Sequence, residues 1–259
     1  SLNIIEHENP ESKIIDELIS QGKIDTIGLK GKWEMFRIFT LANPWPGVSS
    51  ALVIAGSDKR GTIYGMYDVS EQIGVSPWNW WADVPAAQHK ELWVKQGVFS
   101  RGEPAVKYRG IFLNDEAPAL STWTSLKFGG FNSKFYVHVF DLILRLRGNY
   151  LWPAMWGSAF NTDDPLNPQL ADEYGIVMGT SHHEPMIRSQ QEWKRYGSGS
   201  WNYVKNKAGL DKFWEDGIAR NHNYESVVTI GMRGDGDEPM TDSKDMNVNV
   251  KLLENIVDN

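Results

Sequence analysis

The feature that most constrains the fold is a repeated pattern in the second part of the chain. Four apolar segments of strand length each end in polar or small residues, and helical patterns lie between them. The segments are KYRGIFLNDEAP (107–118), NYLWPAMWGSAF (149–160), YGIVMGTSHHEPM (174–186) and SVVTIGMRGDGDEPM (226–240). Strands that alternate with helices predict a parallel sheet, because right-handed crossovers return each strand in the same direction. We therefore expect an α/β fold in which all four strands end at the same edge.

The clearest intervening helix is predicted over residues 133–148. Phe135, Val139, Leu142 and Leu146 recur at helical spacing, and Gly148 follows as a stop. Further helices are predicted over 209–223 and 245–259. Residues 108–259 thus contain four strand–helix units, whereas a closed (β/α)8 barrel needs eight. The pattern predicts either the first half of a TIM-type barrel in a longer enzyme, or an open parallel sheet.

The first hundred residues show a different pattern, which predicts a small α+β domain. Helices are expected at 13–20 and 57–74, the latter with Ser57 or Asp58 as its cap, and strands at 32–41 and 49–57. The stretch QGVFSRGEPAVK (96–107) contains Gly, Ser and Pro and has no periodicity, so it is the expected boundary. We predict an amino-terminal domain over 1–103 and the incomplete catalytic barrel over 104–259.

Composition narrows the class of protein. With 259 residues, of which 41% are hydrophobic and 23% charged, the chain is globular in composition. A net charge of −7 argues against nucleic acid or an anionic membrane as partner, because both require a basic surface. The absence of cysteine excludes disulfides, thiolate zinc sites and cysteine nucleophiles. The first residues do not resemble a signal peptide, which a mature secreted protein would have lost.

The polar residues that follow the four segments are the candidate functional residues. In parallel α/β folds the ligand binds beyond the carboxyl ends of the strands, so these residues are expected to converge. They are Asn114, Asp115, Glu116, Trp152, Trp156, His182, His183, Glu184, Arg233, Asp235, Asp237 and Glu238. Any one group could be a solvated turn, but four groups in equivalent positions favour a site.

Several carboxylates beside tryptophans are typical of glycoside hydrolysis. One carboxylic acid protonates the leaving oxygen, while a second carboxylate activates water or attacks the sugar. The 12 tryptophans have two interpretations, since a buried indole fills a core and an exposed one can stack on a sugar ring. Arg233 could hold a carboxylate on the substrate through a bidentate pair, and a uronic acid would fit.

A metal-dependent hydrolase is an alternative interpretation of the same residues. His182, His183 and Glu184, with Asp235 or Asp237, are of the types that bind metals. The helical H-E-x-x-H spacing is absent, however, and adjacent histidines on a strand point to opposite faces. We favour a site without metal or other cofactor, and an activity insensitive to chelators would dismiss the alternative.

The motifs, taken together, resemble those of glycoside hydrolase family 115, the xylan α-1,2-glucuronidases. The resemblance begins near residue 50 and rests on the stretches SSALVIAGSDKRGTIYGMYDVSEQIGVSPWNWWADVP, YRGIFLNDEAP, NYLWPAMWGSAFN, YGIVMGTSHHEPMIRS and TIGMRGDGDEPM. It implies a secreted or periplasmic inverting enzyme that removes glucuronic acid or its 4-O-methyl ether from glucuronoxylan. It also implies an α+β domain followed by a (β/α)8 barrel, in a chain several hundred residues longer.

The resemblance also assigns expected roles. Asp237 is the expected catalytic or substrate-activating carboxylate and Arg233 the uronate-binding cation, with Asp115 and Glu184 as further candidate acids and His183 as a hydrogen-bond donor to the sugar. The other expected substrate-binding residues are Trp80, Trp81, Trp152, Trp156, Asp235 and Glu238. Another essential acid is implied beyond Asn259. The expected partners are glucuronoxylan or its oligosaccharides, and either the remainder of the polypeptide or a second copy in a homodimer.

Two interpretations from other classes remain open. A sugar-binding fragment without catalysis would keep the aromatic residues and Arg233, and would bind glucuronoxylan without cleaving it. A purely structural fragment of an enzyme would do neither. The full-length reading frame is the most informative single observation, because a barrel completed downstream would decide both fold and function.

Overall fold

The computed structural model describes residues 4–5, 13–236 and 238–258, and the chain divides into two compact units. The first unit comprises Ser1–Arg109 and Asp141–Asn149, and the second comprises Gly110–Phe140 and Tyr150–Asn259. The sequence pattern placed a boundary after residue 103 and assigned 141–149 to the second domain. The segment 141–149 belongs to the first unit because its side chains form hydrogen bonds with residues of that unit. For example, the Tyr67 hydroxyl donates to Asp141 Oδ1 at 2.6 Å.

The first unit is built on a four-stranded sheet of order β1-β3-β2-β4. The strands are β1 (Ile4–Ile5), β2 (Phe36–Trp45), β3 (Val48–Gly56) and β4 (Val98–Arg101). β2 pairs antiparallel with both β3 and β4, and β1 pairs parallel with β3. The mixture of pairings confirms the predicted α+β character of this part of the chain.

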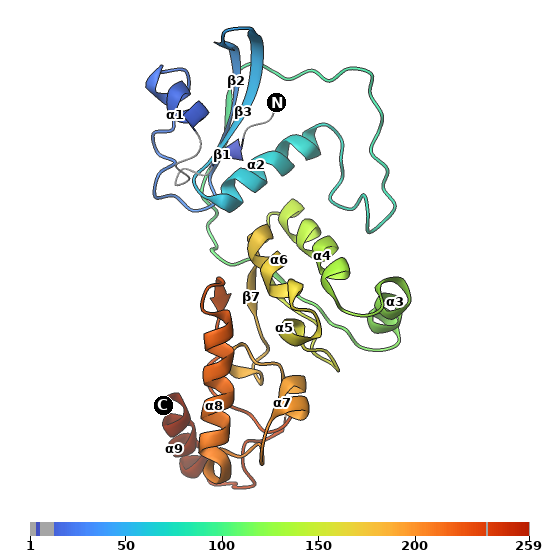
Figure 1. The fold of residues 1–259 in the computed structure, drawn as a ribbon, viewed down its shortest axis with the longest axis vertical. Helices are drawn as coiled ribbons and strands as arrows, with labels where there is room; N and C mark the ends of the chain where they lie inside the picture. Colours follow the sequence, from blue (N-terminus) through green and yellow to red (C-terminus); the bar gives the residue numbers. More distant parts are fainter. Residues whose placement is uncertain (1–3, 6–12, 237, 259) are drawn as a thin grey trace. The chain divides into compact units, whose positions relative to one another are not determined.

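Within the described part of the first unit, α1 (Lys13–Ser20) and α2 (Lys59–Gln72) are helical, and α2 runs alongside the sheet (Figure 1). Asp58 caps α2, since its carboxylate accepts a hydrogen bond from Gly61 N at 2.7 Å. Side chains of α1 pack with alternate residues of β2 and β3, as period-2 strands allow. That core cluster consists of Ile15, Leu18, Ile24, Leu29, Phe39, Val53 and Ala55.

A buried carboxylate joins distant parts of the first unit. Glu34 is 2% exposed, and its Oε1 accepts hydrogen bonds from Arg60 Nε at 2.6 Å and from Asn149 Nδ2 at 2.7 Å. Its Oε2 pairs with the guanidinium of Arg109. The backbone N–H of Arg109 also donates to Asn149 Oδ1 at 2.8 Å. A single buried negative charge, balanced by two cations, thus holds the residues that immediately precede β5 and β6.

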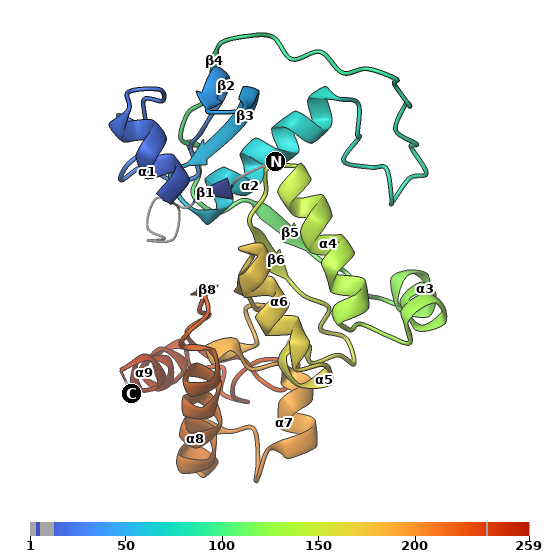
Figure 2. The same ribbon diagram turned by 45° about the horizontal axis from the view of Figure 1, so that its top comes forward.

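The second unit contains the predicted parallel sheet, of order β5-β6-β7-β8. β7 is labelled in Figure 1, and β5, β6 and β8 are labelled in Figure 2. The strands are β5 (Gly110–Phe112), β6 (Tyr150–Trp152), β7 (Val177–Gly179) and β8 (Ser226–Val227). Every neighbouring pair is parallel and follows chain order. The parallel direction predicted from the sequence is therefore confirmed.

Helices alternate with the strands of this sheet along the chain, and several form a second hydrophobic cluster. The helices of the second unit are α3 (Ala119–Phe128), α4 (Ser133–Arg145), α5 (Phe160–Asp163), α6 (Leu166–Tyr174), α7 (Gln190–Tyr196), α8 (Tyr203–Asn221) and α9 (Met246–Val257), with the end of α4 belonging to the first unit. On α4, Tyr136 stacks on Phe140 at 5.9 Å between ring centroids and meets Phe160 edge-on at 4.8 Å. α8 and α9 lie side by side (Figures 1 and 2) and share a cluster with Trp193 and Met232.

One expectation about the fourth strand is wrong. The fourth apolar segment contains the run from Val227 to Ile230, which on its sequence predicts a buried strand, but β8 ends at Val227 and Ile230 is 65% exposed. The physical reason is its position: β8 stands at the edge of the sheet in the described residues and pairs only with β7. An apolar run indicates burial, but it does not supply the neighbour that covers it.

None of the helices among the described residues combines the length and the hydrophobicity needed to cross a bilayer.

Candidate active site

Side-chain contacts join the carboxyl ends of the parallel strands in two pairs. The end of β5 meets that of β6 where Met155 N donates to Asp115 Oδ1 at 3.1 Å. The end of β7 meets the segment after β8 where Thr229 Oγ1 donates to Thr180 O at 3.1 Å. These contacts place the polar residues after each strand at the same edge of the sheet.

Asp115 lies just beyond β5 and is 1% exposed. Its Oδ2 is buried and has no hydrogen-bond partner among the described residues. Burial raises the pKa of Asp115, and the backbone N–H groups of Met155 and Trp156 oppose that shift. A buried acceptor without a donor is unfavourable by about 1–3 kcal/mol, so a ligand that supplies a donor would be favoured here.

His183 and Arg233 lie close enough to influence each other, although they come from different strand ends. His183 is 4% exposed and its Nδ1 has no hydrogen-bond partner within the described part of the chain. Burial lowers the pKa of His183, and the positive charges of His182 and Arg233 lower it further. A neutral imidazole and an exposed guanidinium can together donate hydrogen bonds to an anionic sugar.

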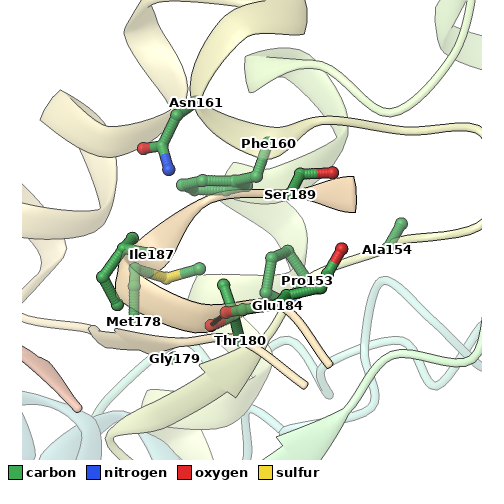
Figure 3. A pocket seen from close by; sticks show the side chains of 10 residues that line it. All are labelled: Pro153, Ala154, Phe160, Asn161, Met178, Gly179, Thr180, Glu184, Ile187 and Ser189. Atoms are coloured by element: carbon green, nitrogen blue, oxygen red, sulfur yellow. Dashed lines mark hydrogen bonds between the residues drawn. The ribbon is translucent and has the colours of Figure 1, made fainter. Parts of the chain in front are cut away.

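Glu184 lines a small cavity of about 20 Å³ (Figure 3). The cavity lies beyond β6 and β7, where Thr180, Asn161 and Ser189 contribute its polar wall. Burial raises the pKa of Glu184 to about 7, against hydrogen bonds donated by Gln190 N and Ser189 that favour the carboxylate. The cavity has room for about one water molecule.

The backbone after Glu184 is in an unusual conformation. Met186 and Ile187 both have φ of +56°, in the left-handed region that non-glycine residues rarely adopt. Such strain persists only where surrounding contacts over-determine it, and it gathers at functional sites. Here Met186 N donates to Thr229 O at 3.0 Å, which holds the strained turn to the segment after β8.

The loop after β8 carries the remaining charged candidates. Arg233, Asp235 and Glu238 are exposed, and Gly234 N donates to Glu238 O at 2.9 Å, which closes the loop. Asp237, the expected catalytic carboxylate, lies outside the described residues. Its role, and the roles of Asp115, Glu184 and Glu238, therefore remain predictions.

The aromatic candidates divide between the two units. On β6, Trp152 donates to the Tyr150 hydroxyl and meets Phe112 of β5 edge-on at 5.5 Å, whereas Trp156 is half exposed. Trp80 and Trp81 belong to the first unit, where their rings meet at 4.8 Å. Their predicted contact with substrate remains a prediction.

Two residues with contacts at this site were missed by the sequence analysis. The side-chain amide of Gln190 donates to Asp235 Oδ1 at 2.6 Å, and Trp201 Nε1 donates to Arg233 O at 2.8 Å. Ser189 and Glu192 have the spacing of a capping box, which would have placed Gln190 at the start of a helix. No sequence pattern, however, links either residue to a loop more than thirty positions away.

Two further features of the second unit lie apart from these residues. A pocket of about 610 Å³ lies beside α8, lined by residues that include Trp214 and Ile218, and none of the predicted site residues lines it. Within the part of the chain that the structure describes, no group of three or more His, Asp or Glu side chains is placed to hold a metal ion.

A parallel sheet with polar residues at the carboxyl ends of its strands is typical of α/β proteins, which bind their ligands beyond that edge. Within this class, the chain belongs to glycosyl hydrolase family 115, whose sequence model matches residues 101–259. This finding confirms the resemblance seen in the motifs.

A solved structure extends the match to the first unit. It is described as a family GH115 4-O-methyl-α-glucuronidase with specificity for decorated arabinogalactans. It is 36% identical, superposes with a TM-score of 0.84, and the match covers 93% of this chain and 32% of that chain. The chain thus spans about a third of the solved relative. No curated protein matches it.

Proposed function

We propose that this chain contributes the amino-terminal domain and the first half of a (β/α)8 barrel to an inverting α-glucuronidase. The enzyme would release glucuronic acid or 4-O-methylglucuronic acid from polysaccharide side chains. The observation that supports this most strongly is the match to the solved 4-O-methyl-α-glucuronidase at 36% identity over nearly the whole chain. The parallel sheet, with four strands in chain order, fits the first half of such a barrel.

The proposed chemistry assigns separate tasks to the residues at the strand ends. Arg233 would bind the uronate carboxylate, and the neutral imidazole of His183 would donate a hydrogen bond to the sugar. Asp237 and Asp115 are the proposed reacting carboxyl groups, with Glu184 as a further candidate. An inverting enzyme uses one group as general acid and the other as general base for water, held roughly 6.5–9.5 Å apart.

The polysaccharide is part of the proposal. We propose glucuronoxylan as the substrate and a secreted or periplasmic location, where such polymers are met. The solved relative acts on decorated arabinogalactans, so an arabinogalactan with terminal 4-O-methylglucuronic acid is the second candidate. In both polymers the group recognised at this site is the uronic acid, and the backbone polymer would be bound by surfaces outside it.

The test is an assay of the complete natural protein on both polymers, with Asp237→Ala as the variant. We expect wild-type protein to release the uronic acid, and Asp237→Ala to lose about 10²–10⁴ of the turnover while remaining folded. Asp242→Ala removes an exposed aspartate five positions along the chain and serves as control. A variant that keeps more than about a tenth of wild-type turnover would remove Asp237 from the reaction.

Binding without release by the wild-type protein would favour a sugar-binding function. A chelator that abolishes release would favour the metal-dependent alternative.

A further inference from the structure

The backbone of Gln190 is fixed at the start of α7. Ser189 caps the helix through its side chain, and Glu192 accepts a hydrogen bond from Ser189 N at 3.2 Å to complete a capping box. Gln190 N donates to Glu184 Oε1 at 3.0 Å, so the helix start is also bonded to the segment after β7. Gln190 is 7% exposed, and its side chain extends from a backbone that these hydrogen bonds hold in place.

The side chain of Gln190 extends from the start of α7 to the loop after β8. Gln190 Nε2 donates to Asp235 Oδ1 at 2.6 Å, across 45 positions of sequence. Gly236 lies against the same amide, since a Cβ built on Gly236 would stand 3.6 Å from Gln190 Nε2. Gly236 has φ of +84°, a conformation that glycine adopts without strain.

The loop after β8 has further hydrogen bonds at Arg233 and Gly234. Trp201 donates to the carbonyl of Arg233, and the contact between Gly234 and Glu238 closes the loop on itself. Among the described residues, Gln190 is the hydrogen-bond donor to the Asp235 carboxylate. Without it, the loop would keep its attachment near Arg233 and lose the one at Asp235.

We propose that Gln190 is a positioning residue, which fixes the 233–238 loop against α7 and thereby sets where Arg233 and Asp235 meet the substrate. The consequence for turnover rests on the proposed glucuronidase function, whereas the attachment of the loop does not. An amide suits this task because it donates a hydrogen bond to the Asp235 carboxylate and carries no charge of its own. A carboxylate in the same place would repel it.

The attachment is tested by hydrogen exchange on the complete natural protein, without substrate. We expect Gln190→Ala to speed amide exchange in peptides covering 231–240 and to leave the first unit at its wild-type rate. Gln191→Ala is the matched control, because the same residue type is removed one position along α7. Among the described residues, Gln191 makes a hydrogen bond only through its backbone N–H, to Ser189 Oγ. Unchanged exchange in Gln190→Ala would overturn the proposal.

Turnover provides the second readout. Gln190→Ala should lower kcat/KM on uronic substrates by about tenfold to a hundredfold, because small misplacements of binding groups are amplified in the rate. Gln190→Glu keeps the size, and its protonated form can donate to Asp235. Its activity relative to wild type should therefore rise as pH falls, and a flat ratio would overturn the positioning role.

The two readouts separate the inference from the proposed function. Wild-type protein that releases no uronic acid from either polymer would defeat the proposed function, and the exchange rates would still decide whether Gln190 holds the loop. If Gln190→Ala does not fold, Gln190→Glu gives the same exchange test at neutral pH, where its charge should release the loop.

Discussion

At the scale of single residues, the clearest prediction concerns Arg233. Arg233→Lys keeps the positive charge and loses the planar, bidentate fork. We therefore expect kcat/KM to fall about tenfold or more on a uronic substrate and to change little on its carboxyl-reduced counterpart. The carbonyl of Arg233, which accepts a bond from Trp201, is unaffected by this change. Equal losses on the two substrates would assign Arg233 a structural role instead.

Glu184 provides a prediction about pH. Its pKa is raised from 4.5 to about 7 by burial, so between these values the folded protein keeps a proton that the unfolded chain releases. The stability that the protonated form provides is fully present below pH 4.5 and is lost as pH rises through about 7. The full loss corresponds to about 3 kcal/mol.

Glu184→Gln stays neutral, and its amide oxygen can still accept the bond from Gln190 N. The variant should therefore gain stability relative to wild type as pH rises from about 4.5 to about 8. Thermal unfolding of both proteins at the two pH values measures the difference. A gap in Tm that does not change with pH would show that Glu184 ionises normally in the folded protein.

The residue scale also shows what the sequence could predict about the site. Strand-end positions of Asp115, His183 and Arg233 followed from pattern alone, because parallel strands bring their carboxyl ends together. The sequence could not show that Glu184 lines a small cavity, since that depends on how Phe160 and Ile187 pack around it. Gln190 was missed for a similar reason, because its partner is set by tertiary structure.

At the scale of elements, one prediction concerns Gly65, through which α2 packs on the sheet of the first unit. A Cβ on Gly65 would lie 2.4 Å from Ile54 Cγ2 and 3.3 Å from Phe36 Cδ2. Alanine improves helix propensity by about 1 kcal/mol, whereas overpacking costs about 1–3 kcal/mol. Ile54 is 1% exposed and β-branched, so it has little freedom to move away.

We therefore expect Gly65→Ala to lower Tm despite the better helix former. Gly102→Ala is the control, because no atom lies within 4 Å of a Cβ built there. Ile54→Ala removes the methyl group that clashes, so the double variant should be more stable than the sum of the two single effects predicts. Additive losses would mean that the clash does not govern packing of α2.

Element boundaries show the limit of periodicity. The helix predicted over 133–148 begins at Ser133 as expected but ends at Arg145, and Leu146 is 49% exposed. The chain turns at Arg147, whose φ is +62°, and its guanidinium bonds to Asp68 Oδ1 at 2.9 Å. A long-range ion pair with Asp68 thus forms just after the end of this helix. The spacing of hydrophobic residues cannot predict such a contact. The helices α3, α5, α6 and α7 were likewise not predicted, since each is short or lacks a regular apolar stripe.

At the scale of the whole molecule, the described sheet has two edges. β5 and β8 each pair on one side only, and large apolar residues near them are exposed, among them Phe112 at 44% and Ile230 at 65%. Unpaired strand edges and exposed apolar surface favour association with further chain. In the solved relative, the match covers only 32% of the chain, so most of that protein lies outside the matched part.

The last prediction follows from these edges: residues 1–259, expressed on their own, should not hydrolyse glucuronoxylan. An inverting reaction needs two carboxyl groups roughly 6.5–9.5 Å apart around a water, and in the proposed half-barrel four strands would supply at most half of the loops that surround them. We expect the isolated polypeptide to associate or to aggregate, as measured by light scattering, and to show no release of uronic acid. Activity that returns when the remaining segment of the natural protein is added would support the half-barrel. A monomeric polypeptide that unfolds cooperatively and hydrolyses the polymer at the rate of the complete protein would contradict it, because four strands would then suffice for both the fold and the site.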